Sequence, residues 1–180
     1  MRIIAGQYRA KKLIAPENTD IRPTSDRARE AVFNILYSAV GGVEEKNVLD
    51  VFAGTGAMGF EALSRGAHHV CFIDKDVEVV LKNANMFAKE KEKVCVLRAN
   101  VENLPRAREQ FDIVFLDAPY DKGLNEMALT NLLNKGFLKN GAVCVVETRK
   151  NEQLKLPENF KPFDERIYGM AKLSFYTFCM

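Results

Sequence analysis

Four consecutive residues have functional groups suited to holding an aromatic amine. They are Asp117-Ala118-Pro119-Tyr120, directly after the apolar run 113–116. One reaction open to such an amine is attack on a methyl group carried by a sulfonium. The nitrogen shares its lone pair with the ring, so it attacks poorly unless acceptors bind its hydrogens. The Asp117 carboxylate and the Ala118 carbonyl are such acceptors, and a stacked Tyr120 ring would fix the approach of the base. The alternative is a strand-ending turn with a packed tyrosine.

A glycine-rich segment lies upstream. Gly54, Gly56 and Gly59 satisfy GxGxxG, a weak signal that also fits nicotinamide and flavin folds. Glycines let the backbone approach a ligand, and the helix N-terminus behind them favours a phosphate or a carboxylate, so an amino-acid-bearing cofactor is also accommodated. Asp74 lies at the spacing expected for a carboxylate that binds ribose hydroxyls, and Asp76 is the less favoured substitute.

Alternating apolar runs and helical stretches position these two segments. Strands are expected at 48–52, 70–73, 94–97, 113–116 and 142–146, and helices from residue 57, over 77–89 and over 124–133. Continuous apolar strands indicate a parallel, doubly wound α/β sheet covered on both faces. After Pro162, runs 166–168 and 173–178 are expected to form antiparallel strands at one edge. The carboxyl ends of the central strands border the ligand crevice in such sheets, so Asp117 should face the glycine loop.

The first forty residues are expected to form an extension. Segments 2–6 and 11–15 are predicted to pair as a hairpin, and a helix should follow with Ser25 as its N-cap. Apolar residues recur there at helical spacing, so one face should pack on the main domain, with Arg27 and Arg29 elsewhere. We divide the chain into an extension, 1–40, and a main domain, 41–180.

Basic residues are concentrated at the start of the chain. The net charge is only +2, but residues 1–40 carry seven Lys or Arg against four Asp or Glu. None of the first sixteen residues is acidic, as expected for a small phosphate-binding surface, although a solvated strand face explains the charge equally well.

The sequence gives little support for a membrane or secreted location, or for a metal site. No run approaches the ~20 apolar residues of a membrane span, and no apolar signal segment follows Met1, so we expect a cytoplasmic protein. The four cysteines are scattered through apolar runs and should be buried free thiols. His68 and His69 lack further ligands, so we predict no metal site.

The chain resembles, over nearly its whole length, the RsmD-like S-adenosylmethionine-dependent methyltransferases, which make N2-methylguanine in small-subunit (16S) ribosomal RNA. The similar segments are MRIIAG at 1–6, RPTSDR at 22–27 with RE at 29–30, LDVFAGTG at 49–56, EALSRGA at 61–67, FLD at 115–117, Arg166 and YG at 168–169. The resemblance implies a seven-stranded class I methyltransferase fold. It implies cofactor contacts by Asp50, Phe52, Gly54, Gly56, Asp74, Asn100 and Asp117, with Asp50 at the methionine end, Asp74 at the ribose and Asn100 near the adenine.

Two residues depart from the family pattern. Ala118 replaces the first proline of Asp-Pro-Pro-aromatic, which keeps the carbonyl acceptor but loses rigidity, partly restored because Pro119 restricts the residue before it. Asn100 stands where an acid is usual, so an acceptor oxygen remains without the charge.

We therefore predict methyl transfer from S-adenosylmethionine to guanine N2 in ribosomal RNA, within the small subunit or an assembly intermediate, by a monomer. The resemblance implies guanine 966, and the base must be splayed out of its stack. Catalytic roles are assigned to Asp117, Ala118, Pro119 and Tyr120. RNA contacts are assigned to Arg2, Arg9, Lys11, Lys12, Arg22 and Arg27.

Three alternatives remain open. An adenine-N6 DNA methyltransferase would use the same acceptors, but it usually needs a recognition region for which this chain has little room. A non-catalytic ribosome-assembly protein would bind the cofactor and RNA without transferring a methyl group. A nicotinamide oxidoreductase is the weakest of the three.

Overall fold

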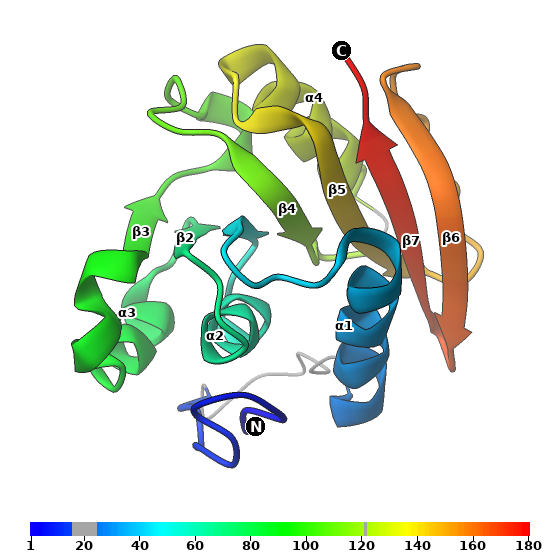
Figure 1. Ribbon diagram of the computed structural model, residues 1–180. Coiled ribbons are helices and arrows are strands. Elements are labelled where there is room, and N and C mark those ends of the chain that lie inside the picture. The colour runs from blue at the N-terminus through cyan, green and yellow to red at the C-terminus, as the bar shows by residue number, and fades with distance from the viewer. Residues whose placement is uncertain (16–24, 121) are drawn as a thin grey trace.

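A seven-stranded sheet flanked by helices forms the body of the protein (Figure 1). The computed structural model describes residues 1–15, 25–120 and 122–180. The strands are β1 Asn47–Val51, β2 His69–Asp74, β3 Val94–Arg98, β4 Phe111–Leu116, β5 Leu138–Arg149, β6 Phe160–Tyr168 and β7 Ala171–Phe178. The α-helices are α1 Asp26–Val40, α2 Ala57–Ser64, α3 Glu78–Asn85 and α4 Leu124–Lys135, and short 3-10 helices cover Ala88–Lys93 and Val101–Asn103.

The strand order is β3-β2-β1-β4-β5-β7-β6. Strands β1 to β5 pair in parallel, whereas β7 is antiparallel to both β5 and β6. The sequence therefore predicted correctly both the parallel, doubly wound core and the antiparallel edge. This sheet is the seven-stranded class I methyltransferase architecture.

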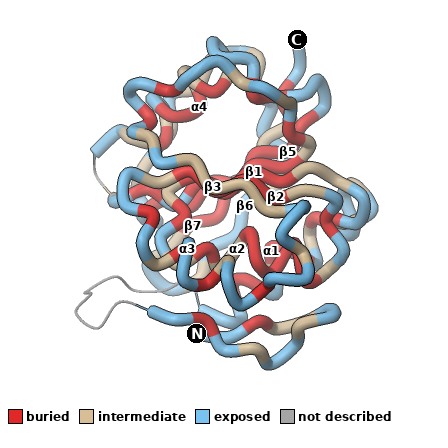
Figure 2. The backbone as a smooth tube through the Cα atoms, turned by 90° about the vertical axis from the view of Figure 1, so that its left-hand side faces the viewer, coloured by how far each residue is buried: buried red, intermediate tan, exposed pale blue. Residues whose placement is uncertain are grey.

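Helices cover both faces of the sheet (Figure 2). One core lies between the sheet and helices α1, α2 and α3, and includes Val32, Phe60 and Val80. A second core lies on the α4 side and includes Leu129 and Leu132. Because alternate strand residues point to opposite faces, Val48 and Ile113 enter the first core, whereas Leu49 and Val114 enter the second.

The predicted N-terminal hairpin forms only in part. A single antiparallel bridge pairs Arg2 with Lys12. The backbone N–H groups of Ile4 and Ala5 donate instead to the Glu61 carboxylate of α2, at 2.7 and 3.0 Å. Ile3 makes the last backbone bonds of the hairpin, to Lys11 and Ala10, and beyond it the segment docks on α2.

Glu61 is the buried centre of this docking. Its side chain is fully buried, and its Oε1 also accepts from Arg65 Nε at 2.8 Å. We expect Glu61→Ala to lower the free energy of unfolding by about 3 kcal/mol, because it leaves two amides and a cation without their acceptor. Urea unfolding measures this, with Glu158→Ala, an exposed acid, as the control. Equal stability of both variants would contradict the docking role.

Helix α1, which lies within the extension, begins where the sequence predicted, but one of its residues is placed differently. Ser25 Oγ accepts from the Ala28 amide at 3.1 Å, which confirms Ser25 as the N-cap. Arg29, however, was wrongly placed off the packed face, because its side chain is 1% exposed. Arg29 donates to the Arg2 carbonyl at 2.7 Å and to Asp26 at 2.9 Å, so it joins α1 to the N-terminal segment.

The thiols differ in one respect from the prediction. Cys71 and Cys144 are buried and Cys95 is half-buried, but Cys179 is exposed because it follows the end of β7. Within the described residues no group of three His, Cys, Asp or Glu could hold a metal ion. No described helix is long and apolar enough to cross a membrane.

Candidate functional site

The glycine loop connects β1 to α2. Phe52, Gly54 and Gly56 all have left-handed backbone conformations, with φ of +61°, +53° and +77°. A Cβ on Gly56 would lie 2.6 Å from the Phe60 ring, and one on Gly59 would lie 2.3 Å from the Phe72 ring. These glycines therefore permit the turn and the close packing of α2 on the sheet, as the pattern predicted.

Asp74 orders the tip of this loop from the end of β2. Its Oδ2 accepts from the Gly54 amide at 2.8 Å, and its Oδ1 accepts from the Asp76 amide at 3.0 Å. The Asp76 carboxylate accepts instead from the Glu78 amide at the start of α3. Of the two acids considered from the sequence, Asp74 is the one that touches the glycine loop.

Asp50 lies beneath the loop. Its side chain is buried and accepts from the Gly59 amide at 2.8 Å. Burial raises the pKa of Asp50 to about 7, against the opposing effect of that hydrogen bond. The carboxyl group can therefore change its charge near neutral pH.

This raised pKa predicts a pH dependence of stability. The folded state binds the Asp50 proton more tightly than the unfolded state, so this contribution is full below pH ~4 and is lost as pH rises to about 7. Asp50→Asn resembles the neutral form. The free energy of unfolding of Asp50→Asn minus that of wild type should rise by roughly 2 kcal/mol between pH 5 and pH 7. Wild type loses ~1.4 kcal/mol for each pH unit between the unfolded and folded pKa values of Asp50. Urea unfolding at both pH values tests this, and a difference that does not change with pH would contradict it.

A narrow cavity brings the candidate catalytic residues together. It has a volume of about 20 Å³, space for the polar edge of a group rather than for a whole ring. The carboxyl-bearing residues around it are Asp50, Asp117 and Glu147, from β1, the end of β4 and β5. Val32 of α1 and Met58 of α2 also line the cavity. Asp117 therefore faces the β1–α2 region, as the sheet topology predicted.

Tyr120 is held across the end of β5. Its hydroxyl donates to Glu147 Oε1 at 2.7 Å, and the Arg149 guanidinium lies 5.6 Å from the ring centroid. Burial, and then the hydrogen bond to Glu147, raise the pKa of Tyr120 above its usual range. The ring is thus fixed in a neutral state beside the cavity. Ala118 is buried and Pro119 is exposed.

Glu147 was missed from the sequence. The expected strand 142–146 ended three residues too early, because β5 continues to Arg149. An acid at the carboxyl end of a central strand was a usable signal, but only if the strand had been extended by one residue.

Asn100 follows the carboxyl end of β3, the end of the sheet at which Asp74 and Asp117 also lie. Its Oδ1 accepts from the Glu102 amide at 3.2 Å, and it caps the short helix Val101–Asn103. The parallel order β3-β2-β1-β4 places it beyond Asp74 and away from the Asp117 cavity.

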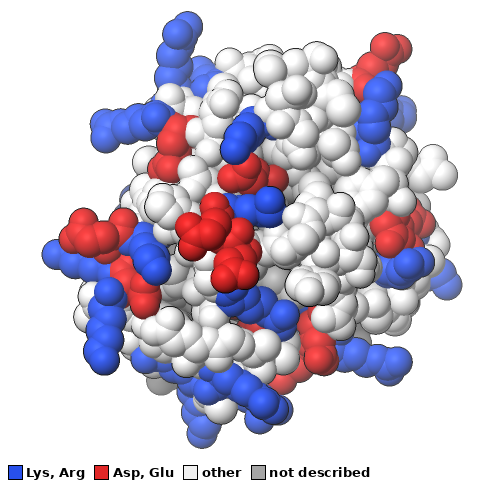
Figure 3. Space-filling model, viewed as in Figure 1, with Lys and Arg blue, Asp and Glu red and all other residues white. Residues whose placement is uncertain are grey.

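The candidate RNA-contacting residues differ in their availability. Arg9, Lys12 and Arg27 are exposed. Lys11 Nζ lies 4.9 Å from the Phe87 ring centroid, and Arg2 pairs with Asp26 at 3.5 Å. Arg22 lies outside the described residues. Figure 3 shows Lys and Arg side chains along the lower end of the molecule, where the N-terminal segment lies in Figure 1.

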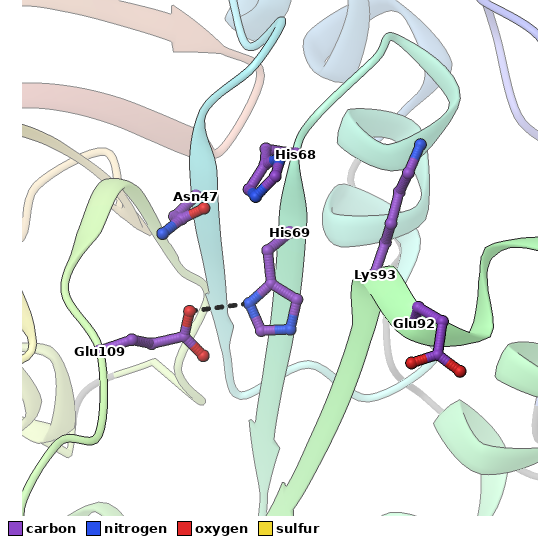
Figure 4. Close-up of a pocket in the computed structure, with 6 residues that line it drawn as sticks. All are labelled: Asn47, His68, His69, Glu92, Lys93 and Glu109. Atoms are coloured by element: carbon purple, nitrogen blue, oxygen red, sulfur yellow. Dashed lines mark hydrogen bonds and ion pairs between the residues drawn. The ribbon is translucent and has the colours of Figure 1, made fainter.

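A larger hollow lies at the opposite end of the strands, where β1 and β2 begin (Figure 4). It has a volume of about 430 Å³, and its lining includes Asn47 and His69 at the starts of β1 and β2. His69 Nδ1 lies 2.9 Å from the Glu109 carboxylate. Because ligands of open parallel sheets bind at the carboxyl ends of strands, this hollow is not the candidate site.

Comparison with known proteins finds matches over nearly the whole chain. A family model described as "Conserved hypothetical protein 95" matches residues 1–177. The ribosomal RNA small subunit methyltransferase D of Haemophilus influenzae is 36% identical, over 98% of this chain and 93% of its own length. The chain belongs to the RsmD-like methyltransferase family. The enzyme of the same name from Escherichia coli strain K12 is 34% identical, over 98% of this chain and 89% of its own length.

Two solved structures, described as a putative methyltransferase and a putative methylase, share the whole fold. The Escherichia coli protein yhhF superposes with a TM-score of 0.86 at 34% identity, covering 99% of this chain and 98% of that one. A Haemophilus influenzae structure has a TM-score of 0.81 at 33% identity, with the same coverage of both chains. The RsmD-like family therefore includes the N-terminal segment as well as the sheet.

Proposed function

We propose that this chain transfers a methyl group from S-adenosylmethionine to the N2 amine of a guanine in small-subunit ribosomal RNA. The observation that carries the proposal is the position of Asp117 at the end of β4, in a cavity that it shares with Asp50 and Met58, the residues on either side of the β1–α2 glycine loop. Curated relatives over nearly the whole chain are named as small-subunit ribosomal RNA methyltransferases. The proposed substrate places the reaction in the cytoplasm.

The residues at the glycine loop suit S-adenosylmethionine. A Cβ on Gly54 would meet only the Phe52 carbonyl oxygen, at 3.9 Å, so the loop is open to a ligand there, and Asp74 would accept from the ribose hydroxyls. Asp50 and Phe52 would lie at the methionine end, and Asn100 near the adenine. When bound, the cofactor supplies an electrophilic methyl group on sulfur.

The chain's own residues would then activate and orient the amine. The Asp117 carboxylate and the Ala118 carbonyl would accept the two amine hydrogens and localise the nitrogen lone pair. Tyr120, held by Glu147, would stack on the splayed base and keep the nitrogen in line with the methyl group. Asp117 needs only to hold the amine, since water can remove the proton after transfer.

One incubation distinguishes the possible reactions. The purified protein and S-adenosylmethionine are incubated with unmodified small ribosomal subunits, free ribosomal RNA or duplex DNA, and digested nucleosides are identified by mass spectrometry. We expect N2-methylguanosine from the ribosomal samples alone. N6-methyladenine from DNA would overturn the proposal in favour of the adenine enzyme, and cofactor binding without product would indicate an assembly factor.

The N-terminal segment would hold RNA phosphates. The support is a set of exposed cations, among them Arg9 and Lys12, on a segment docked to α2 beside the glycine loop. Asn83 of α3 donates to the carbonyls of both Ile14 and Thr55, at 3.0 and 2.9 Å, and so joins this segment to the loop. RNA bound here would lie close to the proposed methyl donor.

A double substitution tests these contacts. Arg9→Gln with Lys12→Gln should weaken RNA binding about tenfold and reduce the slope of log K against log salt by roughly 1.5, because two phosphate contacts are lost. Filter binding across a salt series measures both. The matched control is Lys155→Gln with Lys161→Gln, two exposed cations elsewhere on the chain. Equal losses in both double variants would contradict a specific RNA surface.

A further inference from the structure

Glu147 is placed beside Asp117 by the register of the sheet. Leu116 of β4 pairs with Val146 of β5 in parallel, so the next residue on each strand is Asp117 or Glu147. Aligned residues of parallel strands point to the same face, and both of these line the cavity that Asp50 also reaches. Two carboxyl-bearing side chains therefore stand next to each other where the target base is proposed to enter.

The Glu147 side chain is buried and firmly held. It is 7% exposed, its Oε1 accepts from the Tyr120 hydroxyl at 2.7 Å, and its backbone carbonyl accepts from Asn125 Nδ2 at 2.9 Å. A carboxylate offers about four lone-pair positions, so it can accept from the tyrosine and from a substrate N–H together. Burying a carboxyl group among apolar residues such as Val145 and Leu173 is costly unless donors satisfy it.

The ring atom beside the target amine differs between the two purines. In guanine, the N2 amine lies between N1–H, a hydrogen-bond donor, and N3, an acceptor, so the N1 side is the one that a carboxylate can bind. In adenine, the N6 amine is next to N1 with a lone pair, an acceptor. If Asp117 holds the amine, the neighbouring carboxylate meets the neighbouring ring position, where it attracts an N–H and repels a lone pair.

We infer that Glu147 is a specificity-determining residue that selects guanine by accepting a hydrogen bond from its N1–H. This inference rests on the proposed guanine-N2 activity and explains how the same acceptor turn would reject adenine. Tyr120 contributes by stacking, and its hydroxyl keeps the Glu147 carboxyl group pointing at the base edge.

The test compares guanine with 2-aminopurine, which keeps the amine at position 2 but has a lone pair at N1. The methylated guanine is first mapped with the wild-type protein. Small subunits are then reconstituted with ribosomal RNA that carries either base at that single position. Wild type should prefer guanine in kcat/KM by roughly 10- to 100-fold, the value of one charge-assisted hydrogen bond. Glu147→Gln should bring the ratio close to one, because its amide can donate to the N1 lone pair.

Two further variants keep the test decisive. Tyr120→Phe should lower both rates and reduce the guanine preference without abolishing it, because the carboxylate remains but loses the hydroxyl that orients it. If Glu147→Gln fails to fold, Glu147→Asp, whose carboxylate is one methylene shorter, should reduce the ratio. A wild-type ratio near one, or the same ratio in wild type and the Glu147 variant, would overturn the inference. Wild type that makes no N2-methylguanine at all would instead overturn the proposed function.

Discussion

Asp117→Ala is expected to reduce methyl transfer by about 10³-fold or more while the protein still folds and binds S-adenosylmethionine. Asp117 supplies the carboxylate of the described turn that ends β4, and without it the amine keeps its lone pair in the ring. Loss of one preorganised electrostatic contact to a reacting group has effects of this size. Single-turnover methylation of the ribosomal substrate, with cofactor affinity from calorimetry, measures both quantities.

Asp112→Ala is a matched control for this variant. Asp112 lies on the same strand at its opposite end, where it accepts from Lys139 at 2.7 Å and from the Asn47 amide at 2.9 Å. Its loss should cost some stability and leave the methylation rate within about threefold, since the charge lies far from the reacting atoms. Full activity of Asp117→Ala, in folded protein that binds the cofactor, would show that Asp117 has no catalytic role.

Asp74→Ala is expected to weaken S-adenosylmethionine binding by roughly 100-fold. Two effects combine: the ribose hydroxyls lose a charged acceptor, and the Gly54 amide loses the acceptor that orders the loop at 2.8 Å. Hydrogen bonds to charged groups contribute about 1.5–3 kcal/mol each, so the loss of one or two of them accounts for this factor. Calorimetric titration with the cofactor gives the dissociation constant directly.

Asp76→Ala separates a specific contact from a general loss of negative charge. Asp76 is two residues away and carries the same charge, but its carboxylate accepts from the Glu78 amide of α3. Its replacement should change the cofactor dissociation constant by less than about threefold. Similar losses in the Asp74 and Asp76 variants would refute the assignment of Asp74 to the ribose.

Features carried by local patterns could be predicted from the sequence. Apolar runs of β-branched residues predicted β1 to β4 within a residue or two at each end, because buried strands need apolar side chains on both faces. The glycine spacing predicted the turn into α2, since Phe52, Gly54 and Gly56 need conformations that depend on the chain immediately around them. The place of Asp117 followed from the rule for strand ends in parallel sheets.

Features that depend on distant partners could not be predicted in this way. Glu61 accepts from the amides of Ile4 and Ala5, more than fifty residues away, and so holds the N-terminal segment on α2. Arg29 is charged, which suggested a solvated position, yet its helical spacing with Val32 and Phe33 buries it. In both cases a polar group is buried because another segment supplies its hydrogen-bond partner.

By itself, the sequence determined the order of the strands along the chain, the glycine loop and the acidic turn after β4, because backbone conformation and hydrophobic periodicity are local properties. Only the tertiary structure decided which side chains meet. It placed Glu147 beside Asp117 and within hydrogen-bond distance of Tyr120. It also showed that Asp74, and not Asp76, accepts from the glycine loop. Such neighbours are set by strand register and by hydrogen bonds across the sheet, where a shift of one residue turns a side chain to the opposite face.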